Sequence, residues 1–266
     1  MQPQEKVVEI AAARRRLLRE YAKTFCINEV SCKRIEIELQ SLVKNSEFEA
    51  RARAELGYLH AIRRDYSEAK RNMDRSHLLT GGSDMSVAMA ESLASLYCGK
   101  IKEAAALVAS FELLADPDWL DDVSRLAVHA GMFQKAEQCV QKLRQLKPDS
   151  KGVLTDMMGE VPDTDILAGA AAVRRYGLTD QDIVDRVQVA TDVVMAHVPE
   201  VPFIIYSYSA SYEDGILYAF PLRLAEDKLI DLEWKISEAL VENFDDPLSE
   251  VIAFSVVPSE IVMREH

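Results

Sequence analysis

Apolar residues recur at helical spacing through the first half of the chain, and three stretches share one pattern. In each stretch a large apolar residue is followed three positions later by alanine, and another large apolar residue comes four positions after the alanine. Side chains three and four positions apart lie on the same face of a helix. The pattern predicts three similar helices, marked by Tyr66, Ala69 and Met73, by Ile101, Ala104 and Val108, and by Phe133, Ala136 and Val140.

The equivalent alanines are 35 and then 32 residues apart, a spacing typical of stacked helical hairpins. Twelve positions before each alanine stands a small residue that lets two helices approach closely: Gly57, Ser92 and Ser124. Gly99 and Gly131 stand just before the second helix of their copies, where a tight turn requires a positive φ. We expect hairpins at roughly 47–79, 84–114 and 118–146.

These stretches resemble the tetratricopeptide repeat over about residues 50–148. The resemblance rests on Arg-Asp-Tyr-Ser-Glu-Ala69, Gly99-Lys-Ile-Lys-Glu-Ala104 and Gly131-Met-Phe-Gln-Lys-Ala136, with the closing proline, Pro148, in the third copy alone. The chain departs from the family at His60, Ser95 and Ala127, where an aromatic residue is expected, and at Glu91, where an aliphatic one is expected. The resemblance implies stacked hairpins whose free surface holds another protein.

The first helix of each hairpin should form the free groove of such a stack. Helical phase relative to the buried small residues predicts that seven side chains point into the groove and bind the partner: Arg51, Tyr58, Met89, Leu93, Tyr97, Arg125 and His129. Residues 1–149 are thus interpreted as an N-terminal helical cap followed by three repeats.

The pattern changes after Pro148, and residues 150–162, which contain two glycines and a proline, are interpreted as a linker. Residues 163–266 are expected to form a small α+β domain of about three strands, which makes the fold α+β and mostly α. Helices are predicted at 163–176, 179–197 and 226–243, and strands at 203–210, 216–222 and 251–257.

The net charge of −13 is concentrated in this second part. Residues 1–159 carry 24 Lys and Arg against 23 Asp and Glu, a balance of +1, whereas residues 160–266 carry 7 against 21, a balance of −14. Such asymmetry favours a basic protein partner and disfavours nucleic acid, whose phosphates would be repelled. The alternative is that the acidic surface only aids solubility.

Tyrosines and acids cluster around the predicted hairpin. Tyr206 and Tyr208 share one face of the first strand by period-two spacing. If exposed, aromatic rings among carboxylates would suit an arginine-rich partner. The candidate acidic and aromatic surface comprises Tyr206, Tyr208, Tyr212, Glu213 and Asp214, and the alternative is that these rings pack under a helix.

Signs of chemistry are absent from the sequence patterns. We find no glycine-rich phosphate loop, no recognisable catalytic triad and no zinc motif, and the four cysteines are not paired at metal or redox spacing. No apolar run is long enough for a membrane span, and the chain does not open with an apolar signal region. We therefore expect a cytoplasmic protein with no catalytic residue, metal or cofactor.

One stretch is loosely similar to the minimal nucleotidyltransferase unit. Tyr208-Ser209 stands where that family has Gly-Ser, and the strand Ile216–Phe220 carries neither of the two magnesium-binding aspartates. The resemblance implies a domain that has lost its activity.

These observations favour a non-enzymatic adaptor or chaperone-like protein that binds a protein partner through the groove, the acidic surface or both. One alternative is an immunity protein or antitoxin whose acidic domain neutralises a basic toxin. Another is an inactive nucleotidyltransferase-like regulatory subunit. The identity of the partner and the oligomeric state stay open.

Overall fold

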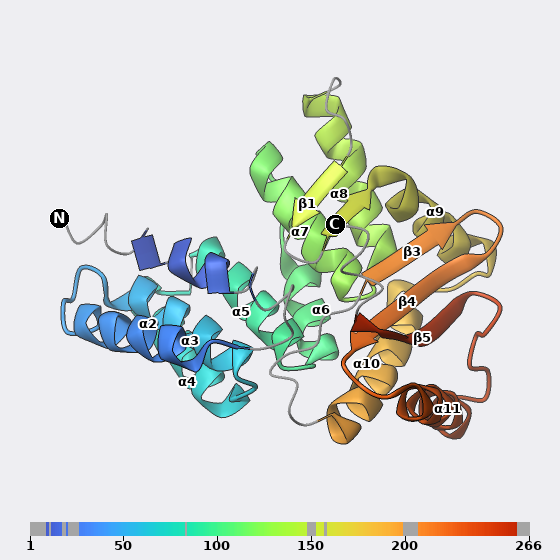
Figure 1. The fold of residues 1–266 in the computed structure, drawn as a ribbon. Helices are drawn as coiled ribbons and strands as arrows, with labels where there is room; N and C mark the ends of the chain where they lie inside the picture. Colours follow the sequence, from blue (N-terminus) through green and yellow to red (C-terminus); the bar gives the residue numbers. More distant parts are fainter. Residues whose placement is uncertain are drawn as a thin grey trace. The chain divides into compact units, whose positions relative to one another are not determined.

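The structure is a computed structural model that describes residues 9–10, 12–17, 20, 27–82, 84–147, 153–156, 159–198 and 207–259. The chain divides into two compact units: Met1–Cys98 with Glu200–Phe203, and Gly99–Pro199 with Ile204–His266. Helices dominate, and a small three-stranded sheet lies in the second unit (Figure 1). The fold is α+β and mostly α, which confirms the predicted fold class.

The first unit contains a repeat-like helical arrangement made of α2 (Glu29–Leu42), α3 (Glu49–Ile62), α4 (Tyr66–Thr80) and α5 (Met85–Tyr97). Helices α3 and α4 pack as a hairpin, and α5 packs on both. Gly57 makes the hairpin contact close, because a Cβ at this position would lie 2.7 Å from Cε of Met73. The small residue inferred from the spacing therefore lies where two helices meet.

The second unit contains α6 (Ile101–Ser110), α7 (Pro117–His129), α8 (Phe133–Leu146), α9 (Asp163–Arg175), α10 (Asp180–His197) and α11 (Glu226–Asn243). Helices α7 and α8 form a second hairpin, and α9 packs on α8. Helix α10 contacts α6, α8 and α11. Ala104, Ser124 and Ala136 are buried, as expected for small residues between helices.

Strands β3 (Ser207–Ser211), β4 (Gly215–Leu222) and β5 (Ile252–Pro258) form the sheet in the order β3-β4-β5. Strand β4 is antiparallel to β3 and parallel to β5, and α11 makes the parallel crossover. Tyr208, Tyr218 and Phe254 lie in register across the three strands and so point to one face of the sheet. That face packs on the α7–α8 hairpin, since the Tyr218 hydroxyl donates a 3.0 Å hydrogen bond to the Val128 carbonyl.

The compact units divide between Cys98 and Gly99, whereas the sequence predicts a linker at 150–162. Two short antiparallel strands, β1 (Val153–Asp156) and β2 (Gly159–Pro162), lie in that segment. Residues on both sides of them share one compact unit because the aromatic face of the sheet is covered by α7 and α8. The middle predicted hairpin is also divided, with α5 in the first unit and α6 in the second.

Helix α10 supplies the N-terminal caps that α6 and α8 lack. Neither Lys100 nor Met132, the N-cap residues of those helices, makes a side-chain cap bond. The Asp180 carboxylate accepts from the backbone N–H groups of Gln134 at 2.9 Å and Lys135 at 3.1 Å. Gln188 accepts from the Lys102 N–H at 3.0 Å and donates to the Gly99 carbonyl at 2.8 Å. These bonds satisfy helix-end groups that would otherwise need water.

The turn before the second helix has the same conformation in all three predicted repeats. Gly99 and Gly131 have φ of 70° and 84°, which confirms the expectation from the sequence. The equivalent residue in the first copy is Arg64, with φ of 58°. A side chain in this left-handed region destabilises the fold by about 1–2 kcal/mol relative to glycine, so the first turn is strained.

Substitution of Ala104 tests the helix packing. Ala104→Leu should lower the free energy of unfolding by about 1–3 kcal/mol, because the added carbons have no space at this fully buried position. Ala106→Leu, at an exposed position of the same helix, should change it by less than about 0.5 kcal/mol. Urea denaturation of both variants measures the difference, and equal effects would contradict the packing described.

Substitution of Arg64 tests the strained turn. Arg64→Gly should raise the free energy of unfolding by up to about 1 kcal/mol, since glycine adopts the left-handed conformation without strain but has more freedom in the unfolded chain. The converse change, Gly131→Ala, should destabilise, because its Cβ would also lie 3.3 Å from the Val184 backbone nitrogen. Thermal and urea denaturation measure both changes in stability. A destabilised Arg64→Gly variant would contradict the strain inferred at this turn.

Substitution of Asp180 tests the cap that α10 provides. Asp180→Ala should destabilise by about 0.5–2 kcal/mol, because two N–H groups at the start of α8 lose their acceptor. Burial raises the pKa of the Asp180 carboxyl, and the two N–H donors oppose that shift. Gln181→Ala is the control, since the Gln181 side chain bonds Asp185 within the same helix. Equal stability of the two variants would show that the cap contributes little.

Candidate functional site

The predicted groove residues of the first unit differ in exposure. Arg51 is exposed, Met89 and Leu93 are half-buried, and Tyr97 is only 2% exposed. The half-buried Tyr58 ring is covered by Arg14, whose Cζ lies 4.1 Å from the ring centroid while its Nε bonds Glu55 at 2.7 Å. Tyr97 therefore lies in the core of this unit, and one face of the Tyr58 ring is covered by Arg14.

The two predicted groove residues of the second unit already have partners within it. Arg125 donates to Asp121 at 2.8 Å and Asp122 at 2.5 Å. Burial raises the pKa of both carboxyls, and the charge of Arg125 opposes the shift. His129 is 3% exposed, and its ring meets that of Tyr208 edge to face with centroids 6.4 Å apart.

His129 and Tyr208 were assigned from the sequence to two separate surfaces, yet they pack against each other. Tyr208 also meets Phe133 at a centroid distance of 5.5 Å. The alternative that the tyrosines pack under helices thus holds for Tyr208 and for the fully buried Tyr218. The remainder of that predicted surface, Tyr212, Glu213 and Asp214, is exposed in the β3–β4 turn. Tyr206 lies outside the described residues.

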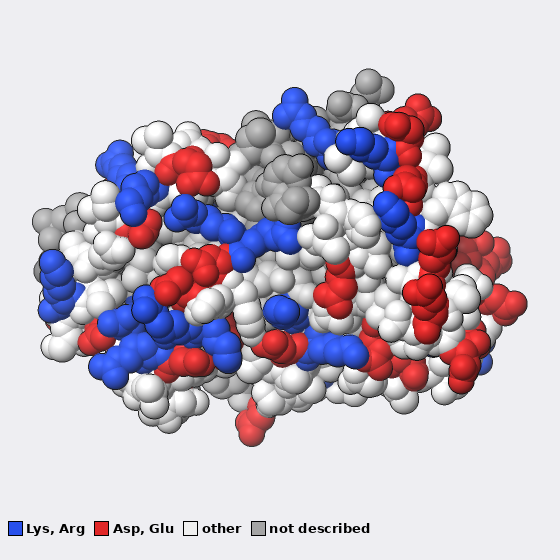
Figure 2. Space-filling view, turned by 90° about the horizontal axis from the view of Figure 1, so that it is seen from below, with Lys and Arg blue, Asp and Glu red and all other residues white. Residues whose placement is uncertain are grey.

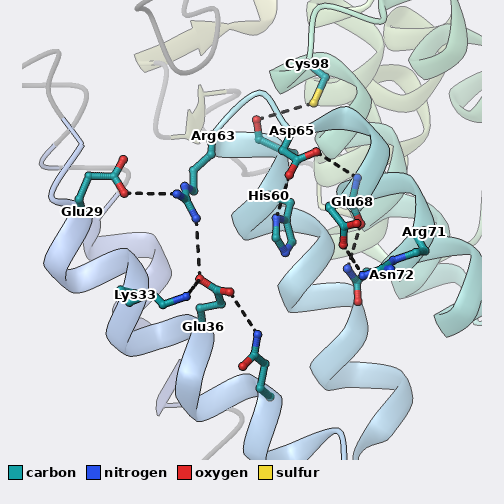
Figure 3. Close-up of polar contacts among 12 residues, drawn as sticks. Glu29, Lys33, Glu36, His60, Arg63, Asp65, Glu68, Arg71, Asn72 and Cys98 are labelled. Atoms are coloured by element: carbon teal, nitrogen blue, oxygen red, sulfur yellow. Dashed lines mark hydrogen bonds and ion pairs between the residues drawn. The ribbon is translucent and has the colours of Figure 1, made fainter.

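A polar pocket of about 260 Å³ lies between α2, α3 and α4 of the first unit. The buried Glu36 carboxylate at its wall accepts from Lys33 at 3.0 Å and Gln40 at 3.1 Å, and Arg63 lies 3.7 Å away (Figure 3). Arg63 also points toward Glu29, at 3.6 Å (Figure 3). Lysine, glutamine and arginine thus surround one carboxylate.

The opposite wall of the pocket is paired in the same way. Arg53 bonds Glu49 at 2.8 Å and approaches Asn72, whose amide donates to the Glu68 carbonyl at 2.9 Å. Arg71 forms an ion pair with Glu68 (Figure 3). Because the charges lining the pocket neutralise one another, we interpret the network as a connection between three helices and assign no ligand to it.

The buried cysteine thiols lack the exposure of a reactive cysteine, and two of them also lack its low pKa. Cys32, Cys98 and Cys139 are buried, and none of the three forms a disulfide with a described residue. Burial raises the pKa of Cys32 and of Cys139 to about 11, so both are protonated at neutral pH. Cys98 lies close enough to the Ala61 carbonyl, at 3.7 Å, to donate a weak hydrogen bond (Figure 3). These cysteines act as small apolar core residues.

A different kind of hollow, of about 820 Å³, lies between α11 and the end of β5 in the second unit. Apolar side chains form most of its wall, with Glu226 and Glu233 among them. The Glu233 carboxylate accepts from the Val256 N–H at 3.0 Å and from the Ser255 hydroxyl at 3.1 Å. The residues lining the hollow are Leu224, Glu226, Leu229, Ile230, Glu233, Trp234, Ser237, Val256 and Pro258.

Two structural features hold α11 in place beside this hollow. Its buried face is formed by Leu229, Leu232, Ile236 and Leu240. At its C-terminal end the buried Arg186 of α10 donates to the Pro247 carbonyl at 3.2 Å, and its guanidinium carbon lies 4.2 Å from the Phe244 ring centroid. The helix is thus fixed along one side, and its other side faces solvent.

The solvent side of α11 carries a second apolar row. Ile230, Trp234 and Val241 are 55%, 67% and 67% exposed. Their spacing of four and seven residues, with Ser237 between, places them on one face of the helix. No residue of this row is among the site residues predicted from the sequence, although its helical spacing could have revealed it.

Carboxylates surround this row. Helix α11 contains six Asp and Glu against two Lys, and Asp and Glu side chains gather over the surface that α11 forms (Figure 2). Large exposed apolar side chains rimmed by charges are typical of protein-binding surfaces. We define the α11 surface as Ile230, Trp234, Ser237 and Val241 with the adjoining hollow.

The described part of the chain contains neither a metal centre nor a membrane-spanning helix. Among those residues no group of three or more His, Cys, Asp or Glu side chains is arranged to hold a metal ion. Of the described helices, none has the length and apolar character needed to cross a membrane.

Comparison with known proteins gives no relative: no protein-family model matches the chain, and no curated protein or solved structure matches it either.

Proposed function

We propose that this protein is a non-enzymatic adaptor, with helical hairpins of the tetratricopeptide type, that binds a protein partner in the cytoplasm. The α11 surface of the second unit is the binding site. The observation that carries the proposal is the apolar row Ile230, Trp234 and Val241, which stays exposed on a helix whose opposite face is fully packed. Leaving an indole and two branched side chains in water is unfavourable, and burial against a partner removes that penalty.

The acidic part of the chain is a better candidate for the binding site than the predicted groove. Tyr97 and His129, two of the groove residues predicted from the sequence, are buried within their own units. Trp234 is an aromatic residue of the type that contributes most to interface affinity. It lies in the acidic part of the chain, residues 160–266. The proposed partner therefore contacts the second unit.

A second candidate function is neutralisation of a basic toxin. The excess of carboxylates along α11 favours it, because an acidic surface speeds association with a basic protein. Inhibition of the captured partner's activity by the purified chain would distinguish neutralisation from adaptor binding.

Capture of partners from the native host tests the proposal. Wild-type protein should retain specific proteins that Trp234→Asp and Ile230→Asp variants lose by at least about tenfold, because a buried carboxylate in an apolar contact is strongly unfavourable. Quantitative mass spectrometry measures the loss, and circular dichroism confirms that each variant is folded.

Val30→Asp is the matched control, since Val30 is an exposed apolar residue of α2 in the first unit. It should leave capture unchanged. Equal capture by the wild-type and the two α11 variants would assign binding to another surface.

A further inference from the structure

We infer that the α11 surface binds a basic amphipathic helix, that is, a segment with one apolar face bordered by Lys and Arg. This inference rests on the proposed function and adds to it the chemistry of the partner. It follows from three observations on α11: the length of the apolar row, the position of a row of carboxylates beside it, and the hollow at its other side.

The apolar row has the dimensions of a helix contact. From Ile230 to Val241 the helix rises by about 16 Å, or about three turns. The positions 230, 234, 237 and 241 repeat at steps of four, three and four residues. This repeat matches the spacing at which two packed helices present side chains to each other, so a second helix lying along α11 can cover the whole row.

A row of four exposed carboxylates follows the apolar row along one side. These residues are Asp227, Asp231, Glu238 and Glu242. At about 100° per residue, they lie roughly a quarter turn around the helix from the apolar row. Lys235 pairs with Asp231 at 2.7 Å, whereas the other three carboxylates form no ion pair with the described residues. A partner helix with cations along one edge of its apolar face would complement this row.

The hollow borders the apolar row on its other side. Leu229, Val256 and Pro258 line its wall together with Ile230 and Trp234, so large apolar side chains of a docked helix can insert there. Glu233 already accepts from Val256 and Ser255, whereas the exposed Glu226 can meet a cation at the rim. A partner helix that fits this surface thus needs large apolar side chains on one face and cations along both edges of that face.

The same charges make other occupants less favourable. An anionic lipid surface or a nucleic acid would place phosphates against the carboxylate row. A second copy of the chain would need a basic apolar face, and α2, which exposes Val30 and Ile37 beside Lys33 and Arg34, contains three Glu against two cations. A basic segment of another protein satisfies both the apolar row and the carboxylates.

Synthetic peptides test the inference directly. Three helical peptides of about 18 residues are compared: one with a leucine face bordered by Lys and Arg, one with the same face bordered by Glu, and one with the basic composition scrambled. The chain has two tryptophans, so the Trp119→Phe variant reports on Trp234 alone by its emission. Titration calorimetry with the unaltered chain measures the affinity independently of that substitution.

We expect the basic amphipathic peptide to bind at least about tenfold more tightly than the other two and to shift Trp234 emission to the blue. Binding should weaken as salt rises from about 0.02 M to about 0.3 M, because the Debye length shortens. Trp234→Ala should abolish it. Reversal of the row in an Asp227→Lys, Asp231→Lys, Glu238→Lys variant should transfer the preference to the acidic peptide, a result that a merely structural role of these carboxylates would not give.

Equal affinity for the basic and acidic peptides would overturn the inference and leave docking on α11 intact. Binding of neither peptide, with host capture still lost in Trp234→Asp, would overturn the inference and leave the proposed function standing. Sedimentation velocity of the chain alone identifies the remaining case: a dimer that Trp234→Asp dissociates would assign the surface to a second copy and overturn the inference.

Discussion

The second unit depends on the contact between α10 and the starts of α6 and α8. Two side chains eight residues apart, Asp180 and Gln188, supply the acceptors that the N-termini of those helices lack. Gly131 lets the α7–α8 turn approach the α10 backbone to within van der Waals distance. Because α10 also carries Arg186, which bonds the Asp246 and Pro247 carbonyls after α11, the position of the α11 surface follows from the same helix. Caps and backbone approach thus determine where the exposed apolar row lies.

The aromatic face of the sheet packs against the end of α7. His129, Tyr208 and Phe133 form a cluster of edge-to-face rings, and the Tyr218 hydroxyl finds its acceptor at Val128. A tyrosine can be buried without penalty only where its hydroxyl has a partner. The side chains that residue type alone would assign to recognition are therefore occupied by contacts within the unit.

Local signals in the sequence predicted much of the fold. The helix predicted to begin at residue 179 is capped there by the Thr179 side chain together with Asp182; Gly99 and Gly131 have the positive φ expected of them. Asp180 lies in the first turn of its own helix, where a carboxylate is favourable, and its bonds to α8 could not be predicted because Gln134 and Lys135 lie more than forty residues earlier. The pairing of His129 with Tyr208 is equally non-local. The exposed row of α11 was readable in the spacing, but exposure depends on which face the rest of the chain covers.

Glu233 has a consequence for the sheet as well as for the hollow. Strand β5 is at the edge, and an edge strand offers free N–H groups to any extended chain. Glu233 occupies the N–H of Val256, and Pro258, two residues on and facing the same way, has none to offer. At these two positions β5 therefore offers no free backbone N–H group to an added strand, so the edge is blocked by a side chain of the neighbouring helix and by a proline.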